Sequence, residues 1–158
     1  MTRRSILLSL AAVAAAGAAA LPIAAGGAQP APRTFVVADS GPTKTFIDDV
    51  APRTTKRGKL SIGDRIVATH AVRIGGKAAG TLHSAATITN PKATSFARFT
   101  AVIDLTFHLT NGDLYAVGFV DAANGGDRYA IVGGDGAYAG ARGSAVGTEN
   151  NITVKLDS

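Results

Sequence analysis

Cysteine and tryptophan are both absent from this chain of 158 residues. Without thiols the chain can form no disulfide, no iron–sulfur cluster and no thiolate metal site, and it has no cysteine nucleophile. Aromatic residues make up only 6% of the chain and charged residues 17%. A protein with this composition has to be held together by the burial of aliphatic side chains.

Clustered positive charge is also scarce. The formal net charge is +5 and falls to +3 without Arg3 and Arg4, and the basic residues are spread along the chain. The one basic cluster, residues 53–59, lies between proline and glycine and is typical of a solvated loop. Nucleic-acid binding would need a basic stripe with stacking aromatics, so we expect no nucleic-acid partner.

The first 28 residues have the pattern of a secretory signal. A charged start is followed by an apolar run to Ala20 and by small residues up to Ala28. Cleavage after Ala28 fits best, with Ala20 as the alternative. The alanine-rich run is weakly hydrophobic and just reaches the roughly 20 residues that a membrane span needs, so we expect no membrane span after its removal.

Residues 29–158 have the size of one domain, which begins with a flexible lead over residues 29–33. Short apolar or alternating segments separated by turn residues predict eight or nine strands and no amphipathic helix. The expected strands are Phe35–Ala38, Thr45–Asp48, Asp64–Ile74, Lys77–Thr89, Phe96–Thr110, Leu114–Asp121, Tyr129–Val132, Ser144–Gly147 and Ile152–Leu156.

Alternation assigns the faces of the long strands. In Asp64–Ile74 the even positions are mostly apolar, whereas the odd positions include two arginines. In Phe96–Thr110 the odd positions are apolar. Gly75-Gly76 and Asn111-Gly112 predict tight hairpin turns, the latter of type I′.

So many consecutive hairpins would leave two exposed sheet edges unless the sheet closed on itself. Closure at about eight strands leaves an interior that is filled by side chains or holds one small ligand. The sequence therefore predicts an all-β fold, a closed and mostly antiparallel eight-stranded β-barrel.

A glycine-dense stretch, Tyr129–Ala145, begins with the seventh expected strand and ends in the eighth. A phosphate-binding loop would need a Lys-Ser/Thr pair and a helix after its glycines, and neither pattern follows here. We interpret the stretch as a structural hairpin loop.

Within it, AIVGGDGAYAGARG resembles the signature of the allene oxide cyclase and dirigent superfamily. LSIGDRIVATHAV, KAAGTLHSAATIT and TNGDLYAVG precede it in the family's order, so the resemblance covers Thr34–Leu156. It implies the same barrel architecture and a homotrimer. Leu114–Asp121 is apolar on both faces, and one face of a monomer would be exposed, which is typical of an interface.

The three histidines have a spacing that fits no compact metal motif, and we expect neither a metal nor a cofactor. Alternation gives His83 an outward direction and places His108 on a polar, solvated face. His70 lies on an otherwise apolar face, where a polar side chain needs a partner. It is either a satisfied core histidine or a ligand contact.

The resemblance implies a pocket around four ligand-binding candidates. His70 falls at a polar pocket position of plant allene oxide cyclases, and Asp39 is the nearest match to their first-strand acid, so these two are also the catalytic candidates. Arg142 matches a dirigent pocket arginine, and Ser84 shares a face with Leu82. Ala86 stands about where the cyclases have a cysteine, which argues against the plant substrate.

Two functions remain open. The barrel could bind a small apolar precursor and guide its cyclisation or stereoselective coupling by confinement, as an isomerase without a cofactor. Alternatively, it could act as a non-catalytic, lipocalin-like binding or scaffold barrel. An open lumen in which His70 faces a carboxylate would favour the first function. A lumen plugged by Phe99, Ile103 and Phe107 would favour the second.

The leader predicts export, to the medium or the cell envelope, with a mature chain that starts near Gln29. Mass analysis of the exported protein should find neither Met1 nor Thr2 at its N-terminus. Arg3-Arg4 resembles a twin-arginine signal, although the missing basic residue after it leaves Sec export open. Replacing both arginines with lysine should block export by the twin-arginine route, and persistent export would indicate Sec.

Overall fold

The structure is a computed structural model that describes residues 33–51, 53, 59–90, 98–125, 127–148 and 150–157. The expected signal of residues 1–28 lies outside the described residues, as does the lead apart from residue 33. Within the first strand, the backbone of Asp39, Ser40 and Thr43 is described but their side chains are not.

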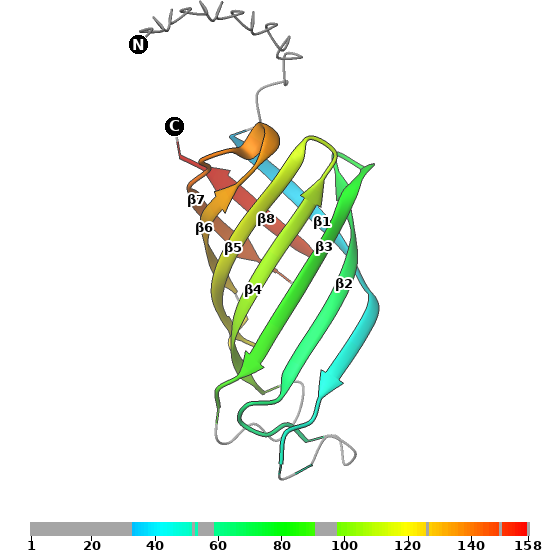
Figure 1. Cartoon of the computed structure of the whole chain (residues 1–158), viewed down its shortest axis with the longest axis vertical. Helices are drawn as coiled ribbons and strands as arrows, with labels where there is room; N and C mark the ends of the chain where they lie inside the picture. Colours follow the sequence, from blue (N-terminus) through cyan, green and yellow to red (C-terminus); the bar gives the residue numbers. More distant parts are fainter. Residues whose placement is uncertain are drawn as a thin grey trace, which may run out of the picture.

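Eight strands form one closed antiparallel barrel, which confirms the predicted fold class (Figure 1). Each strand pairs with the next along the chain, and the last pairs with the first. The strands are β1 (Thr34–Asp48), β2 (Arg65–Ile74), β3 (Lys77–Ile88), β4 (Thr100–Leu109), β5 (Gly112–Asp121), β6 (Arg128–Gly134), β7 (Gly143–Gly147) and β8 (Asn151–Leu156).

The first strand differs from its prediction. The two short strands expected on either side of Ser40–Pro42 are one strand of 15 residues, β1. Its pairing with β2 shifts register between Asp39 and Pro42 and again between Pro42 and Lys44. Such bulges absorb extra residues and bend a strand, which lets a Gly-Pro pair lie within it without ending it.

The two predicted tight turns have different outcomes. Gly75 and Gly76 connect β2 to β3 with φ angles of 58° and 79°, as the sequence predicted. The prediction of a type I′ turn at Asn111-Gly112 is wrong. Thr110 and Asn111 form that loop, Leu109 pairs with Gly112, and no described residue other than glycine has a positive φ.

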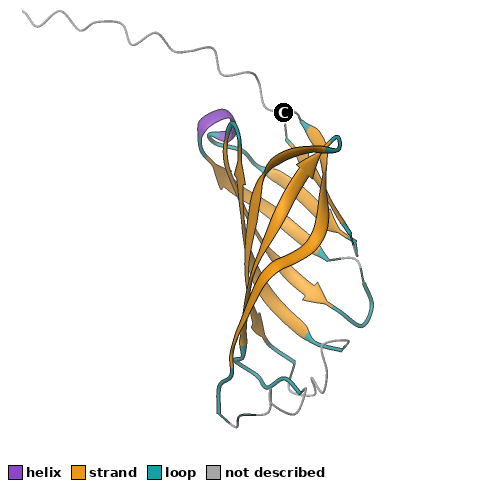
Figure 2. Ribbon diagram, turned by 90° about the vertical axis from the view of Figure 1, so that its right-hand side faces the viewer, coloured by secondary structure: helices purple, strands orange, loops and turns teal. Residues whose placement is uncertain are grey.

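The glycine-dense stretch covers one end of the barrel, the η2 end (Figure 2). It includes most of β6 and the start of β7, and between these strands lies a 3₁₀ turn, η2 (Gly136–Tyr138), where the sequence predicted only a loop. The Ala137 amide donates to the Asn111 carbonyl at 2.8 Å, which ties η2 to the β4–β5 loop. Tyr138 is buried, with its ring centroid 6.2 Å from that of Phe35.

At the other end, Asp64 anchors the loop between β1 and β2. Its side chain is fully buried, and its two carboxylate oxygens accept hydrogen bonds from the backbone amides of Val50 at 3.0 Å and Ser61 at 2.8 Å. Satisfied in this way, a buried carboxylate can stay inside the fold. No helix within the described ranges has the length and apolar character needed to cross a bilayer.

The core follows the predicted faces. Ala68 and Val72 of β2 and Leu105 and Phe107 of β4 are buried, while Arg73 is exposed. The barrel interior is therefore built by alternate residues of each strand. Near the η2 end the interior is filled by side chains with almost no exposed area, among them Val37, Val72, Phe107, Leu114 and Val154.

Two strand glycines provide a matched test of close packing. A methyl group added at Gly118 would overlap the Arg128 carbonyl oxygen and lie 2.5 Å from Cδ1 of Tyr129, whereas one added at Gly133 would meet nothing closer than 3.7 Å. Neither glycine has a positive φ. We expect Gly118→Ala to lower the free energy of unfolding by about 1–3 kcal/mol through overpacking.

Gly133→Ala should be neutral or slightly stabilising, because it reduces the entropy of the unfolded chain. Urea denaturation of both variants measures the difference. Equal stability of the two would contradict the close packing at Gly118.

Candidate functional site

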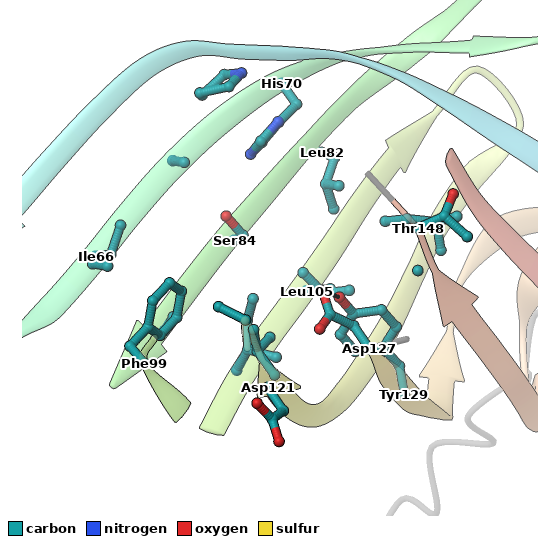
Figure 3. A pocket seen from close by; sticks show the side chains of 18 of the residues that line it. Ile66, His70, Leu82, Ser84, Phe99, Leu105, Asp121, Asp127, Tyr129 and Thr148 are labelled. Carbon is teal, nitrogen blue, oxygen red and sulfur yellow. Dashed lines mark hydrogen bonds between the residues drawn. The ribbon is translucent and has the colours of Figure 1, made fainter. Parts of the chain in front are cut away.

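A cavity of about 500 Å³ occupies the half of the barrel opposite η2 (Figure 3). Its walls are mainly apolar, and they come from both sides of the barrel. The apolar lining residues are Pro42, Ile66, Ala68, Leu82, Ala86, Phe99, Ile103, Leu105, Val120, Ala122 and Ile152.

The cavity lies where β2 and β4 begin and where β5 and β7 end, because Ile66, Phe99, Asp121 and Gly147 all line it. Phe99 and Ile103 are part of its wall and do not fill it. Phe107 is fully buried and is not among the lining residues. The lumen is thus plugged near η2 and open in its other half.

Polar groups line two opposite walls. His70 and Ser84 come from β2 and β3, whereas Tyr129 comes from the start of β6 and Asp127 directly precedes that strand. In a ring of eight strands, β2 and β6 lie four strands apart and therefore face each other. A ligand between these walls would meet hydrogen-bonding groups at both sides and aliphatic side chains between them.

Tyr129 is the best-fixed polar group of the cavity. Its hydroxyl donates a hydrogen bond to Oδ2 of Asp127 at 3.2 Å, and its side chain is only 7% exposed. The ring lies against Gly118 and Gly147, where added methyl groups would come within 2.5 Å and 3.2 Å of its atoms. The two glycines therefore provide the space that the ring occupies.

Asp121 fixes the β5–β6 loop at the cavity edge. Its carboxylate accepts hydrogen bonds from the Asn124 side-chain amide at 2.7 Å and from the Ala123 backbone amide at 3.1 Å. The hydrogen bond from Asn124 lowers the pKa of Asp121 below its ordinary value, although desolvation acts in the opposite direction. The carboxylate thus stays ionised, and the loop is held by an anion at its base.

The four candidates from the sequence lie in different places. His70 and Ser84 line the cavity. The backbone of Asp39 pairs with Val72 in β1–β2, and its side chain is outside the described part. Arg142 follows η2, donates from Nη1 to the Ala141 carbonyl at 2.8 Å and does not line the cavity. Of the candidates, the cavity therefore brings His70 and Ser84 together, and Arg142 is not among its lining residues.

Asp127, Tyr129 and Thr148 were missed by the sequence reasoning, although they line the cavity. Alternation contained a signal for the tyrosine, because Tyr129 has the parity of buried Ile131. Asp127 has the same parity, two residues earlier. Thr148 belongs to the β7–β8 connection, and no periodic pattern indicated its direction.

Chemically, the cavity offers hydrogen bonds and proton-transfer groups within an apolar enclosure. The Tyr129 hydroxyl, the Ser84 hydroxyl and the His70 imidazole can each donate or accept. Across the described ranges, no three His, Asp or Glu side chains converge as a metal site.

Comparisons with known proteins indicate a fold but no family. No protein-family model matches the chain. No curated protein matches it either. Solved structures do match, among them one named pyocyanin demethylase, with a TM-score of 0.63 and 19% identity over 78% of this chain and 99% of that chain. At this identity the likeness shows the barrel fold alone.

Proposed function

We propose that the barrel binds a small, mainly apolar ligand in its lumen and guides the cyclisation or stereoselective coupling of that ligand. The observation that carries the proposal is the open cavity of about 500 Å³, with apolar walls and polar groups on two opposite sides. Ligand pockets typically have this size and this mixture of lining groups.

Apolar and polar lining groups would contribute differently to ligand binding. Aliphatic side chains such as Ile103 and Leu105 favour an apolar ligand because binding removes their surface from water. His70 on one wall and the Tyr129–Asp127 pair on the other orient it through hydrogen bonds. Confinement between fixed groups can accelerate an intramolecular step without a nucleophile.

The sequence resemblance supports this reading, because allene oxide cyclases and dirigent proteins guide such steps inside barrels. The pyocyanin demethylase, by its name, acts on a small molecule and shares the barrel fold. In our proposal the protein is an exported isomerase that needs no metal or organic cofactor.

A non-catalytic carrier, like a lipocalin, is the second candidate. The mainly apolar lining of the cavity favours it, since a carrier needs affinity and no reacting groups. Both functions require an occupied lumen. They differ in whether the ligand leaves the barrel chemically changed.

Lumen binding is tested by a pair of neighbouring alanines. Ala86 lines the cavity, whereas Ala85 pairs with the exposed Asp104 on the outer face. We expect Ala86→Phe to fill the lumen and abolish the fluorescence enhancement of 8-anilinonaphthalene-1-sulfonate. Ala85→Phe should leave it unchanged, and equal responses of the two variants would contradict binding in the lumen.

His70→Asn then tests orientation. A ligand-orienting His70 predicts that binding weakens by about 1–3 kcal/mol when its partner loses a hydrogen bond, with little change in melting temperature. If His70 has a purely structural role, His70→Asn should lower the melting temperature and leave ligand binding to the folded protein unchanged. Native mass spectrometry of protein from its own host identifies the ligand, and turnover of that ligand by the purified protein separates the enzyme from the carrier.

We also propose that the barrel is a homotrimer that uses its outer apolar face. Tyr115, Val117 and Phe119 of β5 point outward and are 37–49% exposed, and Val102 of β4, which pairs with Phe119, is 51% exposed. Such a patch is typical of an interface. Light scattering should give three times the subunit mass at micromolar concentration, and Phe119→Lys should reduce it; a monomeric mass for the unmodified protein would refute the trimer.

A further inference from the structure

Strand pairing brings two of the three histidines together on the outer face of the barrel. His83 pairs with Thr106 and His108 pairs with Thr81, so the two histidines occupy diagonal positions across β3 and β4. Their ring centroids are 5.2 Å apart, with an interplanar angle of 78°. They are 25 positions apart in the sequence, and for this reason linear spacing gave no metal motif.

Each ring is oriented through its Nδ1 atom by a different flanking strand. Nδ1 of His83 lies 3.2 Å from Oγ1 of Thr69 on β2. Nδ1 of His108 lies 2.8 Å from Oδ1 of Asp113 on β5. The two Nδ1 atoms thus face away from the gap between β3 and β4.

In an imidazole, Nδ1 and Nε2 flank Cε1, and each can act as a hydrogen-bonding group or as a metal ligand. With Nδ1 of His83 in contact with β2 and Nδ1 of His108 in contact with β5, Nε2 is the ring nitrogen left to bind a metal ion. Neither Nε2 has a hydrogen-bond partner among the described residues. In the tautomer with the proton on Nδ1, each Nε2 has a lone pair that can bind a metal ion.

We propose that His83 and His108 form an exterior two-histidine chelate for a divalent transition metal ion, with Cu²⁺ as the preferred ion. Two imidazoles bound to one metal through bonds of about 2 Å place their ring centres about 5 Å apart, close to the observed separation. Imidazole suits copper, and Cu²⁺ binds most tightly in the series of divalent first-row metals.

The surroundings support a cation at this position. Asp113 on His108 forms the carboxylate–histidine pair that orients ligands at metal centres and increases their basicity. Asp135 lies next to it and accepts a hydrogen bond from the Asp113 amide at 2.7 Å. Desolvation and then the charges of Asp135 and Asp113 raise the pKa of Tyr115 on the neighbouring strand.

The chelate is open to solvent and supplies only two protein ligands. The His108 side chain is 51% exposed, and His83 is exposed as well. The described chain has no cluster of three metal-ligating side chains, so water molecules would complete the coordination. The preference for Cu²⁺ over Zn²⁺ follows from its higher affinity for the same nitrogen ligands in the divalent series.

The test is a titration of the full chain, purified without an affinity tag, with CuCl₂ in a non-coordinating buffer. Calorimetry should show one Cu²⁺ per chain, and electron paramagnetic resonance should show hyperfine coupling to two imidazole nitrogens. His83→Gln and His108→Gln should each weaken binding at least tenfold and leave one coupled imidazole. His70→Asn, which removes a histidine from the cavity, should leave both measurements unchanged.

Asp113→Asn distinguishes a positioned chelate from an accidental pair, because loss of a carboxylate partner weakens metal binding about 10- to 100-fold. The altered side chains are on the outer face, and thermal unfolding without metal checks that each variant is folded. Unchanged Cu²⁺ affinity in His83→Gln or His108→Gln would overturn the proposal, as would a spectrum without imidazole coupling. Dye binding in the lumen is a separate readout and is expected to be unaffected by these variants.

Discussion

Close approach between neighbouring backbones is the constraint on which this barrel depends. An eight-stranded sheet closes only if its strands tilt against the barrel axis and stagger in register, and here the neighbouring backbone leaves some positions no room for a side chain. A methyl group at Gly80 would overlap the His108 carbonyl, and one at Gly143 would overlap the Lys155 carbonyl. These contacts join β3 to β4 and β7 to β8, so the close strand pairing at these two positions requires glycine.

The interior of the closed barrel has a filled half and an open half. Near η2, Phe107, Leu114 and Tyr138 are buried and fill the space. Toward the other end the wall residues Ala68 and Ala86 are small, and a cavity remains between them and the opposite strands. The filled half supplies the apolar burial that a chain without disulfides needs for stability, and this leaves the other half free to hold a ligand.

Alternation predicted the class of fold and the inward direction of β2 and β4, because one buried face imposes a period of two on the sequence. It could not show that β1 continues through Pro42, since bulges depend on the partner strand. The meeting of His83 and His108 depends on register across β3 and β4. Register is a property of the closed sheet and cannot be read along a single segment.

The pairing of β1 with β8 joins the first strand of the barrel to the last, with Thr34 opposite Lys155 and Ala38 opposite Asn151. Every other pair joins consecutive strands, so those hairpins can form locally. The β1–β8 pair can form only after almost the whole chain is ordered. The same geometry makes the strand order cyclic. A circular permutant that joins the chain ends with a short linker and opens the chain at Gly75-Gly76 would lose the covalent connection between β2 and β3. It would keep all the other strand pairs.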